Sequence, residues 1–188
     1  SRSRPRATPD RGPSFVSAEE LRAKIREVPV FPKPGILFYD ITTLLKDAGA
    51  YREGIKLMLD PYRGDELDIV VGMESRGFIF SAPMAIELGA GLVPVRKLGK
   101  LPAETISVEY ALEYGSNTLE IHRDAIQPGQ KVLIVDDLLA TGGTVQGTIE
   151  LIERLKGEVV GLAFLVELEF LNGRERLGGR RVTSVIRY

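Results

Sequence analysis

In residues 132–144, "VLIVDDLLATGGT", an apolar run leads directly into two acidic residues and then a glycine pair. Residues 132–135 form a continuous β-branched and leucine run, which predicts a strand buried on both faces. We expect a helix from near Thr144 to 156–157, because apolar residues recur there at helical spacing: Val145, Ile149, Ile152 and Leu155. The turn between them follows the carboxyl end of a strand, where parallel α/β sheets bind their ligands.

The composition of the 188-residue chain, with 44% hydrophobic and 27% charged residues, is typical of a globular protein. The net charge of −1 gives no bulk electrostatic reason to expect a nucleic-acid or membrane partner, and no apolar run approaches the roughly 20 residues of a membrane span. The absence of cysteine excludes disulfides and thiolate chemistry and suits a cytoplasmic location. The one histidine, His122, is too little for a zinc site or a Ser-His-Asp triad, and we assign it no role.

The first residues differ in character from the rest of the chain. Residues 1–14 carry four arginines and three prolines without periodicity, which indicates a disordered tail or a vector-derived remnant, with a nucleic-acid-binding arm as the alternative. Order is expected to begin where Ser17 and Glu20 form a capping box at the start of a helix. We therefore expect one domain over residues 15–188.

Strand and helix patterns alternate through the remainder of this domain. We expect helices over 50–62 and through 85–88, and strands over 68–72, 91–96, 159–166 and 182–186. A basic turn, a flexible connection over 103–111 and a hairpin around 115–117 lie between the second and third of these units. The alternation predicts an α/β fold with a mainly parallel twisted sheet flanked by helices.

The turn at the end of the first stretch has the features of an anion site, namely Ala140, Thr141, Gly142, Gly143 and Thr144. It supplies several backbone N–H groups and two hydroxyls at a helix start, where the helix dipole favours negative charge. Its glycines allow close approach and positive φ. A dianionic phosphate fits this turn.

The two carboxylates before the turn need a different partner. Asp136 and Asp137 would repel a phosphate that they faced, so they must address a group beside it that donates hydrogen bonds or is cationic. A sugar diol and the shell of a Mg²⁺ ion both qualify. A phosphate flanked by a diol is a ribose 5-phosphate.

The chain from "FPKPGILFYDIT" to "LVELEFLNGRERL" resembles the type I phosphoribosyltransferases, and in particular those members that act on adenine. "VLIVDDLLATGGT" is similar to their signature for phosphoribosyl pyrophosphate (PRPP), and "GMESRGFIF", "RKLGKLP" and "EYALEYG" follow the family order. Two departures are small: Glu74 stands where Asp is also common, and Tyr39 stands where Arg often occurs. The resemblance implies the family fold, with a small N-terminal hood and a flexible loop that closes over PRPP.

The resemblance also implies a reaction, the Mg²⁺-dependent transfer of the 5-phosphoribosyl group from PRPP to N9 of adenine, which yields AMP and pyrophosphate. Asp136 and Asp137 would accept from the ribose hydroxyls near the developing cation. Arg76 and Lys100 are the first candidates for the pyrophosphate because it needs positive charge. The full set expected there is Glu74, Ser75, Arg76, Arg96, Lys97, Lys100 and Tyr114.

Adenine needs an apolar slot with polar edges. The Phe38 ring would stack on the base, and the backbone groups of Leu37 and Tyr39 would read its edge. By resemblance, Glu113 interacts with N7 of the base and relays a proton, so the catalytic residues expected are Glu113, Asp136, Asp137 and Arg76. The resemblance further implies a cis peptide at Glu74–Ser75 and a homodimer in which Arg96 reaches the neighbouring site.

Three alternatives stay open. The first is a regulator that binds PRPP on the same fold, although the net charge and the lack of an added DNA-binding segment disfavour it. The second is a phosphoribosyltransferase for another base, such as xanthine, orotate or hypoxanthine. The third is a fragment resembling a PRPP synthase, which the hood segment disfavours.

Overall fold

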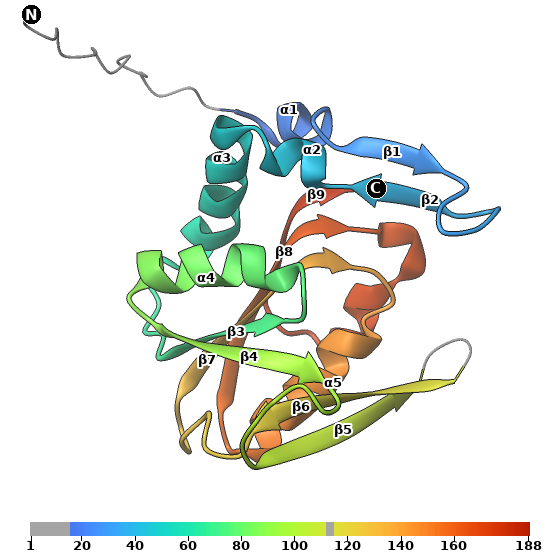
Figure 1. The fold of residues 1–188 in the computed structure, drawn as a ribbon. Coiled ribbons are helices and arrows are strands. Elements are labelled where there is room, and N and C mark those ends of the chain that lie inside the picture. Colours follow the sequence, from blue (N-terminus) through green and yellow to red (C-terminus); the bar gives the residue numbers. More distant parts are fainter. Residues whose placement is uncertain (1–15, 112–114) are drawn as a thin grey trace, which may run out of the picture.

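The computed structural model describes residues 16–111 and 115–188, so the tail expected at 1–14 lies outside the described residues. Its main sheet has seven strands in the order β5-β6-β4-β3-β7-β8-β9, and the neighbours from β4 to β9 pair in parallel (Figure 1). The hairpin of β5 and β6 joins the β4 edge in antiparallel pairing. The strands are β3 (Ile69–Met73), β4 (Gly91–Lys97), β5 (Thr105–Ala111), β6 (Ser116–His122), β7 (Lys131–Leu139), β8 (Glu158–Glu167) and β9 (Val182–Arg187). The predicted α/β class is confirmed.

Helices cover both faces of this sheet, because the central strands are apolar on both sides. On β7, Leu133 and Val135 join the core formed with α3 and α4, whereas Val132 and Ile134 join the core formed with α5. Figure 1 shows α4 and α5 on opposite sides of the parallel strands. The helices are α1 (Ala18–Arg22), α2 (Thr42–Leu45), α3 (Ala48–Leu59), α4 (Gly77–Leu88) and α5 (Gly143–Arg154), with 3₁₀ turns η1 (Asp60–Tyr62), η2 (Glu169–Leu171) and η3 (Gly173–Leu177).

The helix boundaries follow local chemistry. The capping box of Ser17 and Glu20 is present, as predicted. The helix expected over 50–62 is instead α3 followed by the 3₁₀ turn η1, because Pro61 lies at its end and cannot donate a helical hydrogen bond. Among the described residues, no helix is both long enough and apolar enough to cross a bilayer.

A small hood lies above the carboxyl ends of the parallel strands (Figure 1). It consists of α1 and an antiparallel pair of strands, β1 (Arg26–Pro29) and β2 (Leu37–Asp40). The Tyr39 ring lies 3.9 Å from the Tyr188 ring, centroid to centroid, which attaches the hood to the end of the chain's last strand. Two prolines between β1 and β2, Pro32 and Pro34, keep the connecting segment from forming a helix.

The prediction of a flexible connection over 103–111 is wrong in local structure. Residues 105–111, expected within a flexible connection, form strand β5, which pairs with β6 along its whole length. The physical reason is a period-two alternation that the sequence reading missed: Ile106, Val108 and Tyr110 all pack on the core beneath α5. Any movement of this strand over a ligand stays a prediction.

Substitution of the fully buried Leu133 by Ala is expected to lower the free energy of unfolding by about 2–5 kcal/mol, since the loss of a large side chain at 0% exposure leaves a cavity in the central strand. The matched control is Leu98→Ala, because that leucine is 62% exposed and its loss should cost under about 0.5 kcal/mol. Urea titrations of both variants measure the difference. Equal losses would contradict the assignment of β7 as the centre of the core.

Candidate active site

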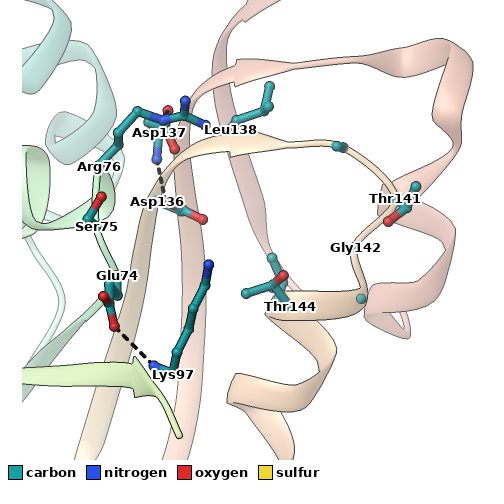
Figure 2. A pocket seen from close by; sticks show the side chains of 13 residues that line it. Glu74, Ser75, Arg76, Lys97, Asp136, Asp137, Leu138, Thr141, Gly142 and Thr144 are labelled. Carbon is teal, nitrogen blue, oxygen red and sulfur yellow. Dashed lines mark hydrogen bonds and ion pairs between the residues drawn. The ribbon is translucent and has the colours of Figure 1, made fainter. Parts of the chain in front are cut away.

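A polar pocket of about 440 Å³ opens at the carboxyl ends of β3 and β7, between the starts of α4 and α5 (Figure 2). It is lined by Glu74, Ser75, Arg76, Lys97, Asp136, Asp137, Leu138, Ala140, Thr141, Gly142, Gly143, Thr144 and Val145. All of these except Leu138 and Val145 were expected site residues. Parallel strands end at one edge, so three segments that are far apart in sequence meet there.

The predicted phosphate turn forms one wall of this pocket. Gly142 has φ of +84°, a left-handed conformation that glycine adopts without steric cost, and α5 begins directly after it. No side chain caps this helix start. The N–H groups of its first turn therefore have no side-chain acceptor, and its first residues line the pocket. A helix start of this kind is suited to bind an anion.

Asp136 and Asp137 lie opposite the turn at the end of β7. The Asp136 Oδ1 atom accepts a hydrogen bond from the Asp137 backbone N–H at 2.8 Å. Burial, and next the charge of Asp137, raise the pKa of Asp136 well above the usual carboxyl range. The two neighbouring carboxylates therefore disfavour one another's negative charge.

Arg76 supplies the positive charge nearest to the aspartates. Its Nε lies 2.6 Å from Asp137 Oδ2, and its guanidinium carbon lies 5.7 Å from the centre of the Phe38 ring. Arg76 thus contacts a carboxylate of β7 and lies near an aromatic ring of the hood, and it also lines the polar pocket next to Glu74 and Ser75. Its expected contact with pyrophosphate stays a prediction.

The basic side chains of "RKLGK" take two positions: two of them pair with Glu74, and the third extends into the polar pocket. The Glu74 carboxylate accepts from Lys100 Nζ at 2.6 Å, from the Lys97 backbone N–H at 3.0 Å and from Arg96 Nε at 3.3 Å. Burial raises the pKa of Glu74, but these hydrogen bonds outweigh it and hold the pKa at about 2. Arg96 and Lys100 therefore lie against Glu74, whereas the Lys97 side chain extends into the pocket (Figure 2).

A second, apolar pocket of about 170 Å³ adjoins the first. It brings together the three residues expected at adenine, Leu37, Phe38 and Tyr39. It shares Arg76, Asp137 and Leu138 with the polar pocket, and its other lining residues are Ile36, Ile41, Val166 and Leu168. The edge of the Phe31 ring packs against Phe38, with centroids 5.1 Å apart.

Three residues that line the apolar pocket from β7 and β8 were not predicted from the sequence: Leu138, Val166 and Leu168. They lie at the same strand ends that carry the polar residues: Leu138 near the end of β7, Val166 near the end of β8 and Leu168 directly after β8. That position was the available signal. Glu113 and Tyr114 lie outside the described residues. The expected cis peptide at Glu74–Ser75 is confirmed.

The family model of the phosphoribosyl transferase domain matches residues 41–179. The chain therefore belongs to the phosphoribosyltransferase family, whose signature turn and paired aspartates line the polar pocket.

Within that family, the chain belongs with the adenine phosphoribosyltransferases. It is 57% identical over 173 residues to the adenine phosphoribosyltransferase of Acidobacterium capsulatum, which covers 92% of this chain and 96% of the relative. A crystal structure of adenine phosphoribosyltransferase from Thermoanaerobacter pseudethanolicus superposes with a TM-score of 0.88 at 52% identity, covering 92% of this chain and all of that one. The enzyme from Saccharomyces cerevisiae, solved with an imino-altritol bisphosphate and adenine, gives 0.85 at 39% identity, with 90% and 98% covered.

Substitution of Asp136 by Asn is expected to raise the free energy of unfolding at neutral pH by about 0.5–2 kcal/mol. The amide keeps the acceptor for the Asp137 N–H but removes one charge of the pair. Because the pKa of Asp136 is raised in the folded state, the folded protein binds its proton more tightly than the unfolded chain does. The stability that this proton contributes is complete below the ordinary carboxyl pKa and is lost as the pH rises through the raised pKa.

Urea titrations at mildly acidic and at neutral pH measure this difference. The gain from Asp136→Asn should grow with pH across that interval. Asp124→Asn, at an exposed position, is the matched control and should show no such trend. A variant that is less stable than the wild type at neutral pH would contradict the charge repulsion argued here.

Proposed function

We propose that this chain transfers the 5-phosphoribosyl group from PRPP to N9 of adenine, releasing AMP and pyrophosphate. The observation that carries the proposal is the pair of adjoining pockets, which share Arg76 and Asp137. The polar pocket has an anion turn beside two carboxylates, and the apolar pocket is bounded by the aromatic Phe38. A ribose 5-phosphate in the first would have its anomeric carbon near a base in the second.

The chemistry suits residues that hold charge rather than a strong base. In the transfer, the bond from the anomeric carbon to the pyrophosphate oxygen breaks, the bond to N9 forms, and the N9 proton leaves. Positive charge develops on the ribose ring and negative charge on the pyrophosphate, so fixed charges and alignment lower the barrier. Asp136 and Asp137 are assigned to the ribose, and Ala140, Thr141, Gly142, Gly143 and Thr144 to its 5-phosphate.

The pyrophosphate is assigned to the opposite wall. Lys97 extends into the pocket there, next to Glu74, Ser75 and Arg76. Lys100 and Arg96 stand behind Glu74 and would have to exchange that carboxylate for phosphate oxygens. Tyr114 is assigned to the same group by resemblance alone.

The donor atoms present suit a magnesium ion that arrives with its substrate. Among residues 16–111 and 115–188, no three acidic or histidine side chains form a metal cluster. Mg²⁺ commonly binds one or two carboxylates together with substrate phosphates, and Asp136 and Asp137 would hold it in that way. When bound, the ion supplies positive charge to the oxygens of PRPP.

We further infer that residues 15–188 act as one domain in a cytoplasmic homodimer. The family match over 41–179 supports a single unit. Exposed apolar side chains on the α4 and β4 side, Ile86 at 82% and Leu92 at 45% exposure, support a covering second copy. Arg96 is then expected near the partner's site.

A panel of bases tests the proposed reaction. With PRPP and Mg²⁺, adenine should give AMP and pyrophosphate, and kcat/KM for hypoxanthine should be lower by about 10⁴, because a site that reads a polar group rejects an analogue that leaves its acceptor unpaired. Comparable values for the two bases, or preferred turnover of xanthine or orotate, would favour a different phosphoribosyltransferase. Binding of PRPP without turnover of any base would favour the regulator.

Glu113→Gln is expected to lower kcat by about 10²-fold while the KM for PRPP changes little, because the amide keeps the shape of the side chain but cannot relay the proton. Steady-state rates at saturating Mg²⁺ measure both constants, and Glu113→Leu should behave alike. The matched control is Glu109→Gln, because Glu109 is an exposed glutamate of β5 that bonds to Ser116 within the same hairpin. An unchanged kcat in both Glu113 variants would leave that residue without a catalytic role.

A further inference from the structure

The phosphate turn is supported from outside by backbone rather than by side chains. Gly173, the first residue of η3, is buried against it. A Cβ atom on Gly173 would lie 2.1 Å from the Ala140 carbonyl oxygen, and one on Gly142 would lie 2.8 Å from the Gly173 carbonyl oxygen. The two backbones are therefore in direct contact, with no room for a methyl group between them.

The next residue holds this contact in place. The Arg174 guanidinium donates to both carboxylate oxygens of Glu167, from Nε at 3.0 Å and from Nη2 at 2.5 Å. It also donates to the Val182 carbonyl oxygen and to Ser184 Oγ, each at 3.2 Å. One side chain thus attaches η3 to the end of β8 and to β9.

Glu167 is buried at the end of β8, where it can hold the Arg174 side chain in a fixed position. Its side chain is only 5% exposed, and its residue pairs with Leu139, the last residue of β7 before the phosphate turn. Burial raises the pKa of Glu167, but the hydrogen bonds from Arg174 outweigh it, and the carboxyl pKa is lowered. The ion pair therefore joins both flanks of the turn, the strand end that leads into it and the segment that closes it from behind.

We propose that Arg174 is a positioning residue for the 5-phosphate: by clamping η3 to Glu167, it keeps the Gly173 backbone against residues 140–142 and so fixes the N–H groups of the turn. The inference rests on the proposed function for the identity of the ligand. Its consequence is specific. Loss of the clamp should weaken the binding of phosphate monoesters but not of the free base.

The test measures Kd for AMP and for adenine by calorimetry, together with KM for PRPP and kcat. Arg174→Met and, independently, Gly173→Ala should raise the AMP Kd and the PRPP KM about tenfold, as expected for the loss of one charge-assisted hydrogen bond to the phosphate. The adenine Kd and kcat should stay within twofold of the wild type, since the phosphate is bound equally in ground and transition states. Arg174→Lys should restore part of the AMP affinity.

Two controls separate positioning from general stability. Arg187→Met removes another arginine near the Glu167 carboxylate, at 4.0 Å, but on β9 and away from the turn, so the AMP Kd should not change. Gly64→Ala adds a methyl group where no atom lies within 4 Å, and it should bind like the wild type. If Arg174→Met fails to fold, Gly173→Ala and Arg174→Lys carry the test.

The outcomes are distinct. An AMP Kd within twofold of the wild type in folded Gly173→Ala or Arg174→Met would overturn the positioning role, as would a parallel loss of adenine binding. A wild type that forms no AMP would overturn the proposed function instead. In that case, ribose 5-phosphate serves as the calorimetric probe, and the same comparison of variants still decides the role of Arg174.

Discussion

The ion pair between Asp137 and Arg76 joins the two pockets on which the site depends. The carboxylate comes from the end of β7 and the guanidinium from the residue before α4, so the pair also ties together two neighbouring strand–helix units. Arg76 lies at the same time over the Phe38 ring of the hood. One ion pair therefore holds the apolar pocket next to the polar pocket that is proposed to bind the ribose.

The sheet tolerates this concentration of charge because the strand that carries it is deeply buried. Leu133, Val135, Val132 and Ile134 all lie at 0% exposure directly before the acidic pair. Their burial stabilises the strand, and the strand in turn presents two adjacent carboxylates that repel one another, which raises the pKa of Asp136. Binding sites that hold like charges together are costly in stability and are kept for function.

Around Glu74, on the other side of the polar pocket, opposite charges lie together instead of like charges. Glu74 gathers Lys100, the Lys97 backbone and Arg96, and its pKa of about 2 reflects these contacts. The carboxylate holds cations close to the pocket without a bound anion, while Lys97 remains directed inward (Figure 2). Lys97 is therefore already directed into the pocket, whereas Arg96 and Lys100 are neutralised by Glu74 and would have to leave it to reach an anion.

Local signals in the sequence predicted the strand and turn of 132–144, the helix after them, the parallel α/β class, and the acidic pair and turn of the polar pocket, because buried runs, helical spacing and glycine turns depend on neighbouring residues alone. The remaining expected residues of that pocket, Glu74, Ser75, Arg76 and Lys97, came with the family resemblance. The sequence did not reveal that Arg76 pairs with Asp137 or that Lys100 pairs with Glu74. Nor did it reveal that Leu138, Val166 and Leu168 line the apolar pocket. The sequence also predicted the wrong local structure for β5, because its alternating apolar residues are recognised as a strand only once they pack on the core beneath α5. Tertiary structure decided these features for a physical reason: they depend on which strand ends become neighbours, and on which charge is nearest once they do.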